Sequence, residues 1–260
     1  MLLGGLQKTT LIDFPGRVAC TVFTVGCNFR CPFCHNKDLV SLALFKKSGL
    51  EPISEKYFFA FLAKRKKILD GICITGGAPT IWPDLPGFCK KIKDLGLEVK
   101  LDTNGGNPEM LKKLIDEKLV DFIAMDVKSS FDEYQNAIEL KTRNSKLKTT
   151  TQNLKLINKI KKSIGLILES GLEYEFRTTI VPGIHDRDIM IKLAQDLKKT
   201  IKQCSNVAME QFEYVLQKFR PKNCLDPKYL KVKPFSDKEM RDILKSVQKI
   251  LPHTKLRGVD

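Results

Sequence analysis

The feature that most constrains this chain is the alternation of short β-branched runs with longer amphipathic runs. Runs such as "GICITG" and "LEVKLDTN" have the length and residue types of buried strands. Runs such as "SEKYFFAFLAKRKKIL" have the spacing of amphipathic helices. The pattern predicts strands at 17–25, 71–76, 97–104, 121–128, 173–182 and 206–215. It predicts helices at 54–69, 85–95, 108–118, 151–164, 187–201 and 236–250, the last with a capping box of Ser236 and Glu239.

A repeated strand-then-helix order predicts an α/β fold with a parallel sheet and helical crossovers. Six such units form either an open doubly wound sheet or an incomplete barrel, and in both the ligands lie at the carboxyl ends of the strands. The 260 residues are enough for one large domain. We expect an N-terminal extension at 1–16, a core domain at 17–225 and a C-terminal helical segment at 226–260 packed on the core.

Polar and glycine residues gather just after five of the predicted strands. Packing alone does not account for such a set, so we expect one site built from several strand ends. The residues are Cys27 after the first strand, Thr75, Gly76 and Gly77 after the second, Asp102 to Gly105 after the third, Asp126 and Lys128 at the end of the fourth, and Pro182 and Gly183 after the fifth.

Three of the eight cysteines lie in "GCNFRCPFCHN", where Cys27, Cys31 and Cys34 are spaced C-x3-C-x2-C. Structural zinc sites use four protein ligands, and His35 is the nearby candidate for a fourth. His35 directly follows Cys34, however, and adjacent residues rarely both reach one metal. A [4Fe–4S] cluster normally takes four cysteines, so three leave one iron open for substrate. The pattern favours a catalytic cluster, with a structural zinc module as the weakest alternative.

The C-x3-C-x2-C motif after a first strand resembles the signature of the radical S-adenosylmethionine (radical SAM) enzymes. Further stretches resemble the activating proteins of glycyl-radical enzymes over nearly the whole chain, with the anaerobic ribonucleoside-triphosphate reductase activating protein as the best fit. These stretches are "GGLQKTTLIDFPGR", "LDTNG", "DFIAMDVK", "EFRTTIVPG" and "KFRPKNCLDP". The resemblance implies a partial (β/α)6 barrel of the radical SAM type.

The resemblance also implies the cofactors and the reaction. Cys27, Cys31 and Cys34 would ligate three irons of a [4Fe–4S] cluster, and S-adenosylmethionine would chelate the fourth. An electron from the cluster would cleave S-adenosylmethionine, and the 5′-deoxyadenosyl radical would abstract hydrogen from a glycine of the partner. The implied partners are a glycyl-radical enzyme, with anaerobic ribonucleoside-triphosphate reductase as the best fit, and an electron donor such as flavodoxin or ferredoxin.

Residues around S-adenosylmethionine follow from the same resemblance. Gly76 and Gly77 would let the backbone approach its amino group, and Lys128 would pair with its carboxylate. The whole set of implied cofactor-binding residues is Phe33, Asn36, Gly76, Gly77, Asp102, Asn104, Asp126, Lys128 and Arg177.

A monovalent cation is a further implication. Asp102, Thr103 and Asp126 would hold it beside the cofactor carboxylate, since acidic groups that face one point need a cation between them. The structural alternative is two unrelated aspartates at strand ends, one of them capping the next helix.

The sequence departs from the family at Ala78, where the family pattern G-G-E-P has glutamate. A carboxylate there would help hold the ammonium group of S-adenosylmethionine. The loss of one charged hydrogen bond costs about 1.5–3 kcal/mol, so binding should be weaker. Ala78 therefore keeps open a chain with reduced or lost activity.

Several of these residues have a structural interpretation as well. Arg177 could reach the cofactor or form an ion pair at the rim of the core, and Phe33 could cover the cluster or only pack. His185 could belong to the site or lie on a surface loop, and Gln217 could contact the ribose. Asn104 could touch the cofactor or adopt a left-handed turn.

Three functions stay open at this point. The leading one is the activase. The core motifs do not separate it from a radical SAM enzyme that acts on another peptide or a small molecule. Ala78 keeps open a non-catalytic homologue that binds the cluster or S-adenosylmethionine. The polar stretch 129–150 is a candidate docking surface for the partner enzyme.

The chain carries 45 Lys and Arg against 30 Asp and Glu, a net charge of +15. The lysines are spread along predicted helices without a nucleic-acid motif, so we expect no nucleic-acid partner, although the excess could attract an acidic protein. No apolar run approaches the roughly 18 residues of a membrane span, and the first residues do not resemble a signal peptide. We expect a cytoplasmic protein with reduced thiols and no membrane partner.

Overall fold

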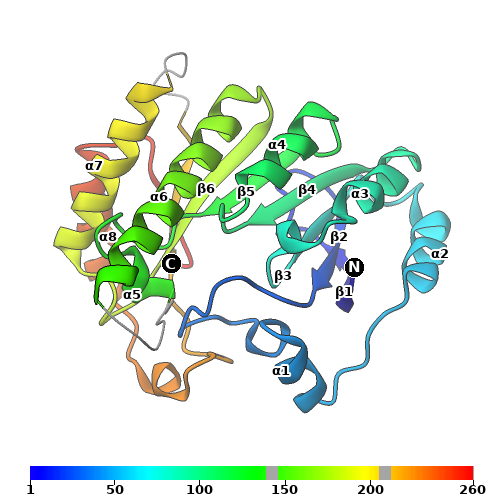
Figure 1. Ribbon diagram of the computed structural model, residues 1–260, viewed down its shortest axis with the longest axis horizontal. Helices are drawn as coiled ribbons and strands as arrows, with labels where there is room; N and C mark the ends of the chain where they lie inside the picture. The colour runs from blue at the N-terminus through cyan, green and yellow to red at the C-terminus, as the bar shows by residue number, and fades with distance from the viewer. Residues whose placement is uncertain (139–145, 205–211, 260) are drawn as a thin grey trace. The chain divides into compact units, whose positions relative to one another are not determined.

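The computed structural model describes residues 1–138, 146–204 and 212–259, which form two compact units. The first unit contains residues 1–28, 36–103 and 109–124, and the second contains the rest. The strands follow one another in the order of the chain, β1 to β8, with helices between most of them (Figure 1). The predicted α/β fold with a largely parallel sheet is confirmed.

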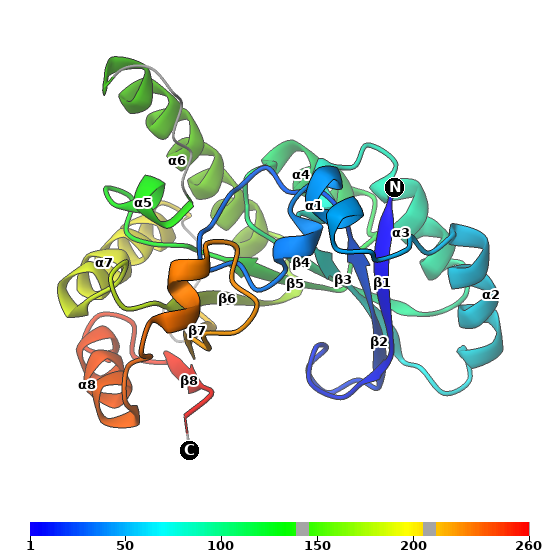
Figure 2. The ribbon, with the colours of Figure 1, turned by 90° about the horizontal axis from the view of Figure 1, so that it is seen from below.

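The strands of the first unit set the positions of the loops that carry its site residues. β1 pairs antiparallel with β2 (Figure 2), whereas β2 with β3 and β3 with β4 are parallel pairs. The sequence predicted no strand at β1, which lies inside the expected N-terminal extension. The other strands agree with the predicted ones to within two residues. The bounds are β1 (Leu3–Thr10), β2 (Ala19–Thr24), β3 (Gly71–Gly76) and β4 (Glu98–Thr103), followed by β5 (Phe122–Asp126), which begins in this unit.

Serine side chains cap two helices of the first unit, α1 and α2. The Ser54 hydroxyl accepts a hydrogen bond from the Tyr57 N–H at 3.1 Å, which caps α2. Phe58 on α2 and Phe88 on α3 stack with their ring centroids 5.3 Å apart, and this contact joins the two helices. The bounds are η1 (Lys37–Leu39), α1 (Leu42–Lys47), α2 (Glu55–Arg65), η2 (Pro79–Ile81), α3 (Leu85–Lys93) and α4 (Pro108–Asp116).

The second unit continues the parallel arrangement. β6 (Glu173–Ile180) pairs with β7 (Tyr214–Lys218), and β7 pairs with β8 (Lys255–Arg257). The strand predicted at 206–215 is displaced toward the C-terminus, because β6 selects its partners from Tyr214 to Lys218. Residues 205–211 lie outside the described residues. The sequence did not predict β8, whose three residues are too few for a periodic signal.

The helices of the second unit are α5 (Tyr134–Ile138), α6 (Lys146–Glu169), α7 (Arg187–Gln203), η4 (Pro227–Lys231) and α8 (Asp237–Gln248). α7 contacts both α6 and α8. The predicted capping box of α8 is confirmed. The Ser236 hydroxyl accepts from the Glu239 N–H at 3.3 Å, and the Glu239 carboxylate accepts from the Ser236 N–H at 2.7 Å.

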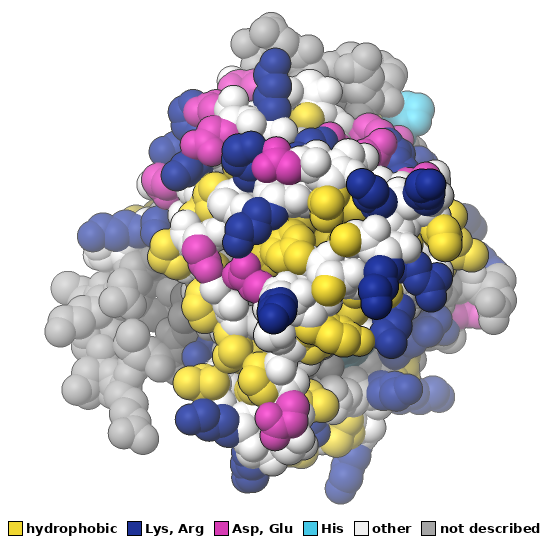
Figure 3. Space-filling model, turned by 90° about the vertical axis from the view of Figure 1, so that its right-hand side faces the viewer, with side chains coloured by type: hydrophobic (Ala, Val, Ile, Leu, Met, Phe, Trp, Pro, Cys, Tyr) yellow, Lys and Arg dark blue, Asp and Glu magenta, His cyan; other side chains and the backbone are white. Residues whose placement is uncertain are grey.

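Charged side chains on the surface are dispersed. Figure 3 shows Lys and Arg side chains spread over one face, with acidic and hydrophobic side chains between them. Several lysines form ion pairs one helical turn away, such as Lys90 with Asp94 at 2.8 Å and Lys112 with Asp116 at 2.6 Å. None of the helices in the described part of the chain is long and apolar enough to cross a membrane.

Candidate active site

The three cysteines of the motif lie on the segment between β2 and η1, and none of them forms a disulfide. In the first unit, the Cys27 N–H donates to the Val40 carbonyl at 3.0 Å. In the second unit, the Cys34 N–H donates to the Cys31 carbonyl at 3.0 Å, and Cys31 is buried. No three His, Cys, Asp or Glu side chains form a preassembled metal site among the described residues. Three thiols within eight residues are nevertheless the donor set that iron–sulfur clusters use.

A segment that follows β7 holds the end of the cysteine loop in the second unit. The Asn223 side-chain amide donates to the His35 carbonyl at 2.9 Å, and the Asp226 N–H donates to the Pro32 carbonyl at 2.8 Å. The Phe219 ring stacks on the His35 imidazole at 5.8 Å between centroids. Burial lowers the pKa of His35. His35 thus packs against Phe219, which agrees with the sequence argument that His35 is a poor candidate for a zinc ligand.

The loop after β3 contains the glycine pair, and its close contacts explain both glycines. A β-carbon at Gly77 would lie 2.1 Å from the Gly26 carbonyl oxygen. Gly76 has a φ of 110°, and a β-carbon there would lie 2.5 Å from the Thr24 nitrogen. The Asn36 side-chain amide donates to the Gly76 carbonyl at 2.9 Å. The structure thus brings together the end of β2, the glycine pair and Asn36.

Ala78 follows the glycine pair and is buried, with 1% of its surface exposed. Its N–H donates to the Gly26 carbonyl at 2.8 Å, and it is the N-cap residue of η2. The backbone of Ala78 therefore positions the start of the cysteine loop. Its side chain supplies no polar group to the site.

Asp102 near the end of β4 has two described partners in the first unit. It forms an ion pair with Lys100, and its other oxygen accepts from the Thr75 hydroxyl at 3.1 Å. Thr103 is buried beside it. Asn104 belongs to the second unit, where its side-chain oxygen accepts from the Gly106 N–H at 3.0 Å. That contact is a local side-chain turn, but the left-handed conformation predicted as one alternative for Asn104 is wrong, since it is Gly105 that has the positive φ, of 70°.

Asp126 ends β5 and lies between two cations. The Arg177 Nε donates to one oxygen at 3.0 Å, and the Lys128 Nζ donates to the other at 3.0 Å. Burial would raise the pKa of Asp126, but the two cations outweigh it and hold that pKa well below its usual range. Burial also opposes the charge on Lys128, but Asp126 and a Cys31 thiolate outweigh it and raise the Lys128 pKa. The whole network contains three cations (Lys128, Arg177 and Arg257) and two carboxylates (Asp126 and Glu175), so one positive charge is left to attract an anion.

A chain of ion pairs links Arg177 on β6 through Glu175 to Arg257 on β8. The Glu175 carboxylate is 3.5 Å from Arg177 Nη1 and 2.8 Å from Arg257 Nη2. Of the two alternatives for Arg177, the structure shows ion pairs, which hold the guanidinium beside Asp126. Gln217 on β7 accepts from the Thr179 hydroxyl at 3.5 Å.

The backbone of Lys128 is held from two sides. Its N–H donates to the Tyr134 hydroxyl at 3.3 Å, and its carbonyl accepts from His185 Nε2 at 2.8 Å. The other His185 nitrogen, Nδ1, accepts from the Val181 N–H at 3.0 Å, so Nε2 carries the proton. His185 is buried, which excludes the alternative of a surface-loop histidine. The desolvation of His185 lowers its pKa from 6.5 to about 4.

Sequence reasoning missed Lys100, Glu175 and Arg257 as neighbours of the predicted residues. Lys100 gave a signal, because a lysine inside an apolar strand two residues before an aspartate shares a face with it. Arg257 gave none, since it lies 82 residues after Glu175. Phe33 is buried, and nothing in its described contacts assigns it to a ligand.

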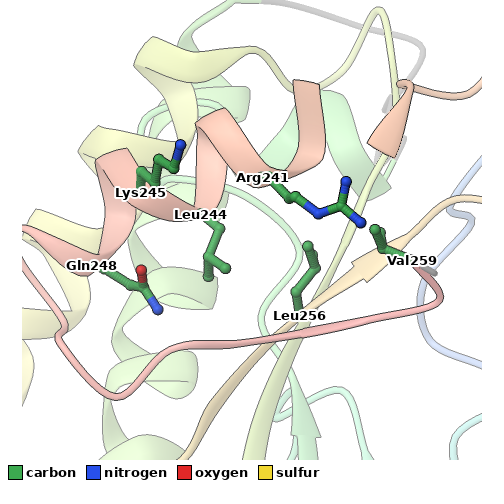
Figure 4. A pocket seen from close by; sticks show the side chains of 6 residues that line it. All are labelled: Arg241, Leu244, Lys245, Gln248, Leu256 and Val259. Atoms are coloured by element: carbon green, nitrogen blue, oxygen red, sulfur yellow. The ribbon is translucent and has the colours of Figure 1, made fainter. Parts of the chain in front are cut away.

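A pocket of about 410 Å³ lies between α8 and β8 and contains none of the predicted site residues. Figure 4 shows Leu244 on α8 and Leu256 on β8 on opposite sides of it, with Arg241 extending toward Val259. Its lining of leucine, valine and exposed basic residues offers no group for redox chemistry.

Comparisons with known proteins show the family of this chain. Residues 21–194 match the Radical SAM superfamily. A proposed glycyl-radical enzyme activating enzyme of Methanocaldococcus jannaschii is 32% identical over 262 residues, which cover 100% of this chain and 97% of that one. A pyruvate formate-lyase-activating enzyme of Clostridium pasteurianum is 30% identical over 152 residues, which cover 52% of this chain and 61% of that one.

A solved structure has the same fold. It is SuiB of Streptococcus suis bound to the precursor peptide SuiA, with a TM-score of 0.58 at 13% identity. The match covers 92% of this chain and 48% of the SuiB chain, so this chain spans about half the length of SuiB.

The chain therefore belongs to the radical SAM superfamily of enzymes, with the partial-barrel α/β fold of that superfamily. Within it, the chain is homologous to glycyl-radical enzyme activating enzymes along its whole length. Membership implies a [4Fe–4S] cluster and S-adenosylmethionine as cofactors.

Proposed function

We propose that this enzyme is an activase for a glycyl-radical enzyme, with anaerobic ribonucleoside-triphosphate reductase as the candidate partner. Held by Cys27, Cys31 and Cys34, a [4Fe–4S] cluster would supply the electron for the reductive cleavage of S-adenosylmethionine, which would provide the oxidant for hydrogen abstraction from a glycine of the partner. The observation that carries this proposal is the full-length similarity to an activating enzyme, combined with three cysteines outside any disulfide on the segment after β2.

The residues of this chain have distinct parts in the proposal. Cys27, Cys31 and Cys34 hold the cluster. Lys128 binds the carboxylate of S-adenosylmethionine, and Arg177 keeps a positive charge in excess at that point because it shares Asp126 with Lys128. Lys128 lies two residues after the end of β5, and Arg177 lies on β6.

Backbone groups complete the proposed cofactor site. Gly76 and Gly77 keep the loop after β3 tight against Gly26, and Asn36 fixes the Gly76 carbonyl. The half-buried Gly77 in this loop is our candidate contact for the amino group of the cofactor. Phe33 and Asn104 are proposed to line the same cofactor.

The monovalent cation implied by the resemblance is a separate matter. The described partners of Asp102 and Asp126 are ammonium, guanidinium and hydroxyl groups. We therefore do not assign a metal cation to Asp102, Thr103 and Asp126.

The partner and the electron donor are proposals of the same kind. We propose flavodoxin or ferredoxin as the donor, since the reaction needs one low-potential electron. Residues 129–150 are the proposed docking surface, although 139–145 lie outside the described residues.

The test is anaerobic. The cluster is reconstituted on the full chain, a strong reductant and S-adenosylmethionine are added, and 5′-deoxyadenosine is measured, with Cys31→Ala as the control. Glycyl-radical formation is then measured by electron paramagnetic resonance with anaerobic ribonucleotide reductase and, in parallel, with pyruvate formate-lyase. Cleavage without a radical on either partner would favour a radical SAM enzyme with another peptide or small-molecule substrate.

Ala78 supports a second candidate function, a non-catalytic homologue that binds the cluster or S-adenosylmethionine. Its buried methyl group gives the cofactor ammonium no carboxylate. Ala78→Glu distinguishes the two. If only the variant cleaves S-adenosylmethionine, the natural chain is a binding protein; if both cleave it, the non-catalytic function is excluded, and the glycyl-radical measurement tests the activase.

A further inference from the structure

β4 carries a buried lysine beside the acidic residue of the proposed cofactor site. Lys100 has 1% of its surface exposed, and its ammonium forms an ion pair with Asp102. Alternate residues of a strand point to the same face, so Lys100 and Asp102 lie side by side on β4. A lysine is rarely buried so completely unless an anion compensates its charge.

The surroundings of this pair are fixed by β3 and β5. The Lys100 Nζ lies 3.7 Å from the Cys73 Sγ, and 5.8 Å from the centroid of the Phe122 ring. The first Asp102 oxygen faces Lys100, and the second accepts from the Thr75 hydroxyl at 3.1 Å. Both oxygens of the carboxylate are thus engaged by the protein itself.

This environment is suited to an ammonium and not to a metal ion. Hard cations bind where several oxygen ligands converge. The Lys100 ammonium is surrounded by one carboxylate, one thiol and one aromatic face, and an added cation at Asp102 would meet an ammonium of the same sign. Burial would strengthen this repulsion, because little water is present to screen the two charges from each other.

We propose that Lys100 is a built-in cation that takes the place of a monovalent metal ion at Asp102. Lys100 is then a positioning residue, since it fixes the orientation and charge of Asp102 without needing to touch S-adenosylmethionine. The binding of S-adenosylmethionine should accordingly be independent of sodium and potassium. The inference rests on binding of S-adenosylmethionine and not on the identity of the glycyl-radical partner.

The experiment measures binding and stability, not turnover. The full chain with its reconstituted cluster is dialysed anaerobically against labelled S-adenosylmethionine in potassium, sodium or choline chloride at equal ionic strength. Thermal midpoints are recorded in the same salts. The variants are Lys100→Met, which removes the charge at similar volume, and Lys100→Met with Asp102→Asn, which removes both charges. Lys93→Met is the matched control, because Lys93 forms a 2.6 Å ion pair with Asp121 in the same unit.

The wild type should bind S-adenosylmethionine with the same dissociation constant in all three salts. The Lys93→Met variant should match the wild type in each salt. Lys100→Met should bind S-adenosylmethionine about tenfold or more weakly in choline, as expected for the loss of one charged partner, with recovery in potassium or sodium. The double variant should lose this recovery, because it has no carboxylate to recruit the metal.

Two results would overturn the proposal. One is a wild-type chain that needs potassium or sodium for tight binding or for its thermal midpoint. The other is a Lys100→Met chain that binds equally well in choline and potassium. If Lys100→Met does not fold, the proposal is tested by the dissociation constants and thermal midpoints of the wild type and of the double variant in the three salts. A wild-type chain that binds S-adenosylmethionine as expected in all three salts but forms no 5′-deoxyadenosine would count against the proposed activase and not against the role of Lys100.

Discussion

At the scale of single residues, His185 has a role that its position in a loop does not suggest. It is buried, neutral and bonded at both ring nitrogens, and one of these bonds holds the carbonyl of Lys128. A charged imidazolium would lose the hydrogen bond from the Val181 N–H, because Nδ1 would become a donor. The site therefore depends on a histidine that must stay unprotonated.

The stability of the chain should consequently fall in mild acid. The pKa of His185 is about 4 in the folded chain and 6.5 in its ordinary state, so the unfolded chain takes up a proton first as the pH falls. The contribution is complete above pH 6.5 and is lost progressively toward pH 4, a total of about 3 kcal/mol. Denaturant titrations of wild type and His185→Gln across this range would measure it. Parallel pH profiles for the two proteins would contradict the assignment.

Gly77 illustrates how one residue sets the approach of two loops. Because a β-carbon there would lie 2.1 Å from the Gly26 carbonyl oxygen, Gly77→Ala must displace backbone. We expect a loss of about 1–3 kcal/mol of unfolding free energy, the usual cost of overpacking.

Gly87 is the matched control for that substitution. It lies on α3, and a β-carbon there would meet nothing within 4 Å. Gly87→Ala should be neutral or stabilising by about 0.5–1 kcal/mol, because alanine favours the helix. Thermal denaturation compares the two, and equal midpoints for both variants would refute the argument.

At the scale of elements, the cysteine loop is held by a segment without regular secondary structure. Asn223 has a φ of 56°, a left-handed conformation, and from there its amide reaches the His35 carbonyl at 2.9 Å. Asparagine is one of the few residues that adopt this conformation readily and also donate a side-chain hydrogen bond. The combination indicates that the segment after β7 restrains the end of the cysteine loop.

Asn223→Gly separates the two properties, because glycine keeps the left-handed conformation and deletes the amide. With the His35 carbonyl released, the cysteine loop should loosen, and we expect iron to leave the reconstituted protein severalfold faster. Chelator-trapped iron release would be followed by absorbance. Lys118→Gly is the control, since Lys118 also has a positive φ, of 54°, and lies outside the loop. Equal release rates from wild type and Asn223→Gly would count against the restraint.

At the scale of the whole molecule, the charge is unbalanced. The net charge is +15, and the ion pairs of the described residues do not change that sum. Such an excess speeds the approach of partners with negative charge and slows that of cations. It concerns association and not the fold.

The rate of reduction by an acidic protein donor should therefore fall as ionic strength rises, by on the order of tenfold between low and high salt. Stopped-flow measurement of cluster reduction by flavodoxin would test this. A cationic viologen should show the opposite dependence, because salt screens its repulsion by the chain. A flavodoxin rate that is independent of salt would mean that the excess charge has no part in docking.

The sequence by itself determined the family and most of the strands. β3 was predicted at its observed bounds, and the capping box of α8 was predicted from two residues, because both signals are local. The C-x3-C-x2-C spacing likewise belongs to one short segment. The displacement of β7 and the presence of β8 were not predictable, because register depends on a partner strand far away in the chain.

Only the tertiary structure decided which charges meet. Asp126 is shared by Lys128 two residues away and by Arg177 on another strand. Lys100 forms an ion pair with Asp102 inside the core of its unit. Asp102 and Asp126, which the resemblance implied as ligands of a cation, thus have lysine and arginine as partners. The physical reason is burial, because a carboxylate removed from water must find a positive partner, and the fold determines which one lies within reach.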